Sequence, residues 1–249
     1  MPVFTAAEIR QFMELGYVVG RRMIPGDTVT EYGRLAMAAV ETNRLGTGWK
    51  DSLVLLPDFL GLPARERIAA RQVMQALDEL VGPERWSLPD SFGSWPLLFP
   101  GFARPPWRAI DAAWHVEGRT RMQTRTQPAF AITMILLFSD IGEGDGGTAV
   151  ATGSHKVVAQ VLSRRGDGMA QLEATGAYLS ECPQPPVIEA QGRAGDILFM
   201  HPFTVHATSL NIGQRVRIAC NYRAELRGPL RLSADGDGAL SAVEQALVA

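Results

Sequence analysis

The pattern of apolar and polar residues changes about 110 residues into the chain. Before that point, apolar positions recur every three or four residues, the spacing of amphipathic helices. The first predicted helix begins after Thr5, which forms a capping-box pattern with Glu8, and it ends at Gly16. A second helix is predicted over about residues 27–44, and a third over about residues 63–81.

The third predicted helix carries an apolar stripe that we expect to be buried. The stripe consists of Ile68, Met74, Leu77 and Leu80. The segment 83–106 that follows is rich in proline and aromatic residues and is predicted to be a loop. Two interpretations of its aromatic residues stay open: a hydrophobic plug over a sheet, or the wall of a substrate pocket.

Beyond residue 110 the pattern is that of short strands separated by turns. Residues 130–138 are predicted to form a buried strand because they are almost entirely apolar and include β-branched and aromatic side chains. Further strands are predicted at 148–151, 187–189, 196–200 and 216–222. Many short strands with long connections indicate a mainly-β architecture of the jelly-roll or cupin kind.

Two features flank these strands. Residues 159–184 are predicted to be a long insertion, and loops of that length are often lids or are mobile. Near the end of the chain, Ser241 and Glu244 form a second capping-box pattern, which predicts a short closing helix. We expect one domain over 1–249, with helical support to about 106, a β-core over about 107–224 and a tail over 225–249.

Composition narrows the function classes. A hydrophobic content of 46% with 20% charged residues is typical of a globular chain, and a net charge of −2 gives no electrostatic reason to expect nucleic acid or membrane as a partner. No apolar run approaches the roughly 20 residues that cross a bilayer. With no signal-peptide pattern, Cys182 and Cys220 are predicted to be free thiols in a cytoplasmic protein.

The candidate chemistry lies in a His-x-Glu triplet and a distant histidine. On a β-strand, His115 and Glu117 would point to the same face while Val116 points into the core. With His206 they would form a 2-His-1-carboxylate set, which suits Fe(II) and leaves coordination positions open. Zinc stays possible, although the His-Glu-x-x-His pattern of zinc hydrolases is absent. The other histidines, His155 and His201, are interpreted as structural.

Three further segments carry a resemblance to a known family. GDGGTAVATGSHK lies between the ligand segments, GDILFMHPFTVH contains His206, and Arg217 follows that histidine by eleven residues. The N-terminal FTAAEIRQFMELGYVV also fits. Together they resemble the phytanoyl-CoA dioxygenase-like family of Fe(II)/2-oxoglutarate oxygenases over about residues 4–224.

The resemblance implies a double-stranded β-helix and a set of roles. His115, Glu117 and His206 would hold Fe(II). Arg217 would bind the distal carboxylate of 2-oxoglutarate, and Thr208 would place a hydroxyl near it. Strand alternation alone does not choose between Arg215 and Arg217, and the family spacing favours Arg217. The implied reaction uses O2, converts 2-oxoglutarate to succinate and hydroxylates a C–H bond. The family leaves the substrate class open, and the neutral, aromatic segment before the His-x-Glu triplet predicts a small or medium apolar metabolite.

One residue departs from the family pattern. Glu117 stands where the family usually has Asp, and halogenating relatives lack this carboxylate altogether, which argues against that chemistry. Two alternatives are kept: a non-catalytic cupin-like binding protein, and a Zn- or Mn-dependent cupin-type hydrolase or isomerase, which predicts no need for Arg217. Desaturation or cyclisation would use the same residues as hydroxylation.

Overall fold

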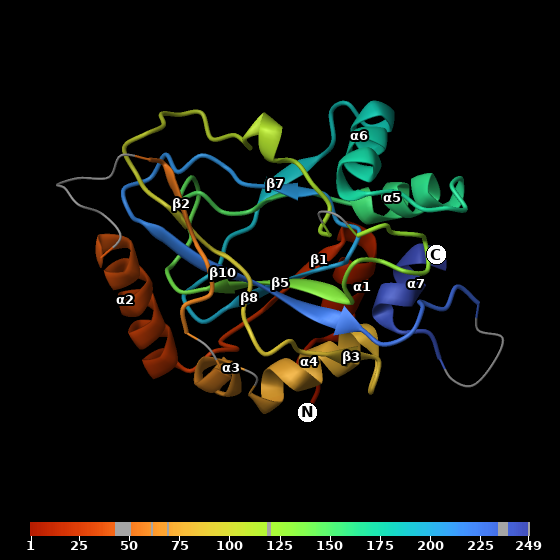
Figure 1. The fold of residues 1–249 in the computed structure, drawn as a ribbon, viewed down its shortest axis with the longest axis horizontal. Coiled ribbons are helices and arrows are strands. Elements are labelled where there is room, and N and C mark those ends of the chain that lie inside the picture. Colours follow the sequence, from red (N-terminus) through yellow and green to blue (C-terminus); the bar gives the residue numbers. More distant parts are fainter. Residues whose placement is uncertain (43–50, 61, 69, 119–120, 234–238, 249) are drawn as a thin grey trace.

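Two antiparallel sheets form the centre of the molecule (Figure 1). The computed structural model describes residues 1–42, 51–60, 62–68, 70–118, 121–233 and 239–248. The larger sheet has the order β1-β8-β5-β10-β4-β2 with β3 beside β10, and the smaller has the order β7-β6-β9. The strands are β1 (Tyr17–Gly20), β2 (Leu53–Leu56), β3 (Trp86–Ser87), β4 (Trp95–Leu98), β5 (Ile132–Leu137), β6 (Ala149–Ala151), β7 (Val187–Glu189), β8 (Ile197–Met200), β9 (His206–Ala207) and β10 (Arg217–Leu226).

Strand β5 is buried on both faces, as its apolar sequence predicts. Ile135 and Leu137 belong to a cluster that includes Val150 of β6, so this face is packed against the smaller sheet. Met134 and Leu136 alternate with them and belong to the larger cluster, which includes the helices. Alternation along β10 therefore assigns Arg217 to the same face as Ala219, between the two sheets.

Seven α-helices and one short 3-10 helix are described around the sheets (Figure 1). They are α1 (Ala6–Leu15), α2 (Gly26–Thr42), α3 (Leu62–Ile68), α4 (Arg71–Val81), η1 (Asp111–Ala113), α5 (Ser154–Ser163), α6 (Gln171–Glu181) and α7 (Ala242–Val248). Helices α1 and α7 pack against each other, as do α5 and α6. None of the helices within the described ranges is long and apolar enough to cross a membrane.

Both predicted capping boxes are confirmed. Thr5 accepts a hydrogen bond from the Glu8 backbone while the Glu8 carboxylate accepts one from Thr5, and Ser241 and Glu244 repeat the arrangement. Gly16 ends α1 with a φ of 83°, a left-handed conformation that glycine adopts without strain. Residues 43–44, the predicted end of the second helix, lie outside the described residues.

The prediction of one helix over 63–81 is wrong. The chain forms α3 and α4 instead, and Ala70 between them has extended backbone angles. Ala70 is neither glycine nor proline, so tertiary packing overrides the helix propensity of this residue. Ile68, Leu77 and Leu80 are buried as expected, but Met74 is 46% exposed.

Two predicted loops also contain regular structure. The insertion 159–184 is largely helical, because α5 and α6 occupy most of it and Gly166 and Gly168 lie in the turn between them. The buried pair Ala174 and Tyr178 has helical spacing, a signal that the glycine-rich turn obscured. The segment 83–106 contains β3 and β4, although its prolines argued against strands.

The histidines interpreted as structural join distant helices. His155, at the start of α5, hydrogen-bonds the Met13 carbonyl oxygen of α1, and His201 hydrogen-bonds the Val243 carbonyl oxygen of α7. Both are buried, with ring centroids 4.8 Å apart. Burial lowers the pKa of His155 to about 4 and the pKa of His201 well below its usual range.

This arrangement predicts acid sensitivity of folding. The unfolded chain takes up protons near pH 6.5, whereas folded His155 does so only near pH 4, so stability falls as the pH drops between these values. The shift corresponds to about 3 kcal/mol for this histidine. Urea unfolding of wild type and His155→Gln should show a shallower acid dependence in the variant. Parallel curves would contradict the assignment.

Candidate metal centre

Two reciprocal backbone hydrogen bonds bring the predicted histidines together. The His115 N–H donates to the His206 carbonyl oxygen and the His206 N–H donates to the His115 carbonyl oxygen, each at 2.9 Å. This is an isolated antiparallel bridge, in which directly opposed residues project to the same side. The two imidazole centroids are therefore only 4.3 Å apart, although the residues come from distant parts of the sequence.

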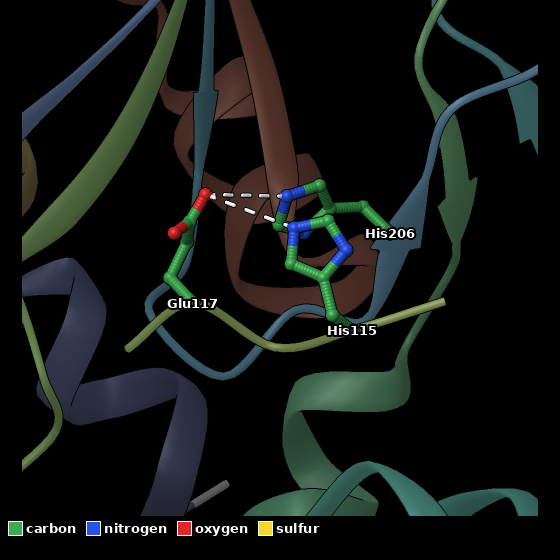
Figure 2. Close-up of side chains that lie close together, drawn as sticks. All are labelled: His115, Glu117 and His206. Carbon is green, nitrogen blue, oxygen red and sulfur yellow. Dashed lines mark ion pairs between the residues drawn. The ribbon is translucent and has the colours of Figure 1, made fainter. Parts of the chain in front are cut away.

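Glu117 faces both imidazole rings (Figure 2). Its Oε1 lies 3.5 Å from Nε2 of His206 and 4.0 Å from Nε2 of His115. One ligating atom from each of the three residues lies within 4.8 Å of the others. Both histidines use Nδ1 for contacts with backbone carbonyl oxygens, of Ala113 and Thr204, which leaves Nε2 of each ring directed at the common space.

Side chains, not a strand partner, hold the segment between the first two candidate ligands. The Val116 N–H donates to Thr175 Oγ1 at 3.1 Å, and its carbonyl oxygen accepts from Gln171 Nε2 at 2.6 Å. Both partners lie on α6, one helical turn apart. The prediction that His115 and Glu117 lie on a regular strand is therefore wrong beyond the single bridge, while Val116 is fully buried as expected.

The charge states of Glu117 and His115 suit metal binding. Burial opposes ionisation of Glu117, but the contact with His206 and the charge of Arg223 outweigh it and hold the Glu117 pKa well below its usual range. Burial, followed by the neighbouring His206, lowers the His115 pKa to about 4. Near neutral pH, Glu117 is a carboxylate and His115 is a neutral imidazole, the forms that coordinate metals.

All five residues predicted for the site line one cavity of about 520 Å³. They are His115, Glu117, His206, Thr208 and Arg217. The Arg217 guanidinium donates to the Pro96 carbonyl oxygen at 3.3 Å and to Thr148 Oγ1 at 3.1 Å. Arg217 is only 4% exposed, whereas Arg215 lies before β10, is well exposed and pairs with Asp145 at 2.7 Å.

Comparison with known proteins decides the family. The model of the phytanoyl-CoA dioxygenase (PhyH) family matches residues 12–219. The chain belongs to this family. No curated protein sequence gives a significant match to the chain.

Several solved structures share the fold of this phytanoyl-CoA dioxygenase family member. The non-haem α-ketoglutarate-dependent carbocyclase SnoK from nogalamycin biosynthesis has 17% identity and a TM-score of 0.57, covering 89% of this chain and 83% of its own. HygX from Streptomyces hygroscopicus, with nickel and 2-oxoglutarate bound, has 17% identity, a TM-score of 0.56 and 96% coverage of both chains. The epimerase SnoN, with Fe3+, α-ketoglutarate and nogalamycin RO, has 18% identity and a TM-score of 0.57, covering 94% and 91%.

The family match confirms the resemblance seen in the sequence, and the structural likeness confirms the predicted fold class. The neighbours bind iron or nickel and 2-oxoglutarate, and the present chain has a facial arrangement of two histidines and one carboxylate in the corresponding fold. The roles of the individual residues stay predictions, because identity below 20% shows the fold alone.

Sequence reasoning missed several residues of this site. Thr148, which accepts from Arg217, lies within the GGT segment that carried the resemblance. Arg223 lies on the same face of β10 as Arg217 and pairs with Glu117, so continued alternation could have found it. Nothing in the sequence indicates that Thr175 and Gln171 contact the Val116 backbone, because these contacts form only when the insertion folds into α6.

The residues present fit the groups that the family implies. Two imidazole nitrogens and one carboxylate oxygen form the donor set that suits Fe(II). Arg217 retains unused donors, because a guanidinium has five N–H groups and its buried Nε has no partner. Burial lowers the Arg217 pKa to about 10, so the side chain stays positively charged at neutral pH.

The contact between α6 and Val116 can be tested by stability. Thr175→Val keeps the shape of the side chain but leaves the buried Val116 N–H without its acceptor, which should destabilise folding by about 1–3 kcal/mol. Thr175→Ser keeps the hydroxyl and is the matched control. Urea denaturation of the three proteins measures the difference, and equal losses in both variants would exclude the hydrogen bond as the cause.

Proposed function

We propose that this protein is an Fe(II)/2-oxoglutarate-dependent oxygenase that hydroxylates a C–H bond of a small or medium apolar metabolite. The observation that carries the proposal is the single cavity lined by His115, Glu117, His206 and Arg217. Its donor set fits iron, and its buried guanidinium fits a dicarboxylate. Family membership and the iron- and 2-oxoglutarate-binding neighbours support it.

The three ligand residues would hold the metal through His115 Nε2, His206 Nε2 and a Glu117 oxygen. When bound, iron with 2-oxoglutarate supplies oxygen activation coupled to decarboxylation to succinate. The reciprocal bonds between His115 and His206 orient both imidazoles without any ligand. The protein thus contributes a set of ligands that needs little reorganisation.

Arg217 would fix the distal carboxylate of 2-oxoglutarate. A guanidinium binds a carboxylate through parallel hydrogen bonds and stays charged when buried. Its hydrogen bonds to Thr148 and Pro96 fix the Arg217 side chain at the start of β10. Because Arg217 is buried, its ion pair with the carboxylate of 2-oxoglutarate would be shielded from water. Thr208 lines the same cavity and offers a hydroxyl to the same ligand.

The rest of the cavity lining favours an apolar substrate. Its apolar contributors include Leu53 and Leu55 of β2, Trp114, Phe130 and Leu172. Leu55 is 53% exposed and Leu172 is 79% exposed. Apolar walls with a few polar groups are typical of sites for small molecules. From the segment 83–106 only Ser94 and Pro96 line this cavity and none of its aromatic residues does; Trp95 and Phe99 are fully buried in the core.

Other outcomes use the same residues. The structural neighbours include a carbocyclase and an epimerase. The same set of ligands and the same co-substrate site could therefore serve a reaction other than hydroxylation in this chain. Product analysis separates the outcomes, because hydroxylation adds an oxygen atom from O2 whereas cyclisation and desaturation remove hydrogen. A Zn or Mn hydrolase would not require Arg217, and a binding protein would form no succinate.

Arg217→Met tests the co-substrate site. The variant removes the buried charge, so 2-oxoglutarate should bind to the Mn(II)-loaded protein at least about 100-fold more weakly, a loss of roughly 3 kcal/mol. Arg215→Met, on the exposed arginine two residues earlier, is the matched control and should bind normally. Isothermal titration under anaerobic conditions measures both. Unchanged affinity in Arg217→Met would reject this role and favour the alternatives.

A further inference from the structure

A second arginine of β10 contacts the candidate carboxylate ligand directly. Arg223 Nη2 donates to Glu117 Oε1 at 3.0 Å, and Arg223 Nε lies 2.8 Å from Glu117 Oε2. The Nε contact is short but is not aligned as a hydrogen bond, so it is an ion contact. The guanidinium therefore engages both oxygens of the carboxylate.

The two oxygens of Glu117 differ in their surroundings. Oε1 is the oxygen near both imidazoles, at 3.5 Å from His206 Nε2 and 4.0 Å from His115 Nε2. Oε1 also accepts a hydrogen bond from Arg223 Nη2 at 3.0 Å, whereas Oε2 lies 2.8 Å from Arg223 Nε. Oε1 is therefore the oxygen that would serve as the metal ligand beside the histidines, while Oε2 is in contact with Arg223.

Arg223 is held in this place by its surroundings. Its guanidinium carbon lies 5.5 Å from the Phe130 ring centroid, within the range of a cation–π contact. On another side lies Gly93, where an added Cβ atom would come within 2.7 Å of Arg223 Nη1. The side chain is 22% exposed, so solvent reaches it only in part.

We propose that Arg223 is a positioning residue that makes Glu117 a one-oxygen metal ligand, and that its guanidinium forms a carboxylate-binding subsite beside the metal. The inference rests on the proposed metal site. It accounts for the glutamate at a position where the family usually has aspartate. The additional methylene, about 1.5 Å of reach, allows one carboxylate to contact both the histidine pair and Arg223.

Chemical rescue tests the subsite. Glu117→Ala removes the side-chain carboxylate and should lower the affinity for Mn(II) by at least about tenfold. Acetate replaces the lost methylene and carboxylate and should bind between the metal and Arg223, restoring most of the affinity. In Glu117→Ala/Arg223→Gln the restoration by acetate should be at least about tenfold weaker, because the guanidinium that holds the second oxygen is gone.

Two further variants control this experiment. Arg121 also lines the cavity and contacts Phe130, but it pairs with Glu225 at 2.9 Å and not with Glu117. Glu117→Ala/Arg121→Gln should therefore be restored by acetate as well as the single variant. Arg223→Lys keeps the charge without the planar fork and should give intermediate restoration, which also covers the case in which Arg223→Gln fails to fold.

The outcomes separate the inference from the proposed function. Wild-type protein that binds no Mn(II) would reject the metal site and the inference together. If the wild-type protein binds Mn(II) but acetate restores the Mn(II) affinity equally in Glu117→Ala and in Glu117→Ala/Arg223→Gln, the inference alone is rejected. Restoration that depends on Arg223 and not on Arg121 would support it, and a Co(II) absorption spectrum returned by acetate to the wild-type form would show that the coordination is restored.

Discussion

The reciprocal backbone pair between His115 and His206 is the interaction on which the rest of the site depends. It joins the segment after η1 to the short strand β9 and directs two imidazoles to the same side. Glu117 reaches them from the irregular segment that follows this bridge. Helix α6 holds this segment through the hydrogen bonds of Thr175 and Gln171 with the Val116 backbone. A single β-bridge and two side-chain hydrogen bonds thus hold His115 and Glu117 in place without a regular strand.

Strand β10 supplies the positive charge that balances this site. Arg217 and Arg223 project from the same face, toward the cavity between the sheets. Arg217 is buried with donors to spare, which suits an incoming dicarboxylate, whereas Arg223 is paired with Glu117. The same residue type therefore has two roles set by its surroundings.

Much of this could be predicted from sequence, for identifiable reasons. Capping boxes at Thr5 and Ser241 depend on residues close in sequence, and the apolar run of β5 depends on composition. Spacing and a family resemblance predict the five site residues, and the fold brings them to one cavity. The break before α4 and the roles of Thr175 and Gln171 depend on long-range packing, which periodicity does not encode. The pairing of Arg223 with Glu117 required both the alternation of β10 and the path of a segment that forms no regular strand.

The most direct test of the account is an anaerobic visible titration of the metal-free protein with Fe(II) and 2-oxoglutarate. If His115, Glu117 and His206 hold iron while Arg217 fixes the co-substrate, wild-type protein will develop a metal-to-ligand charge-transfer band. The band will be absent in His206→Ala and weakened in Arg217→Met. Tight Fe(II) binding by wild-type protein with no such band on addition of 2-oxoglutarate would contradict the oxygenase account.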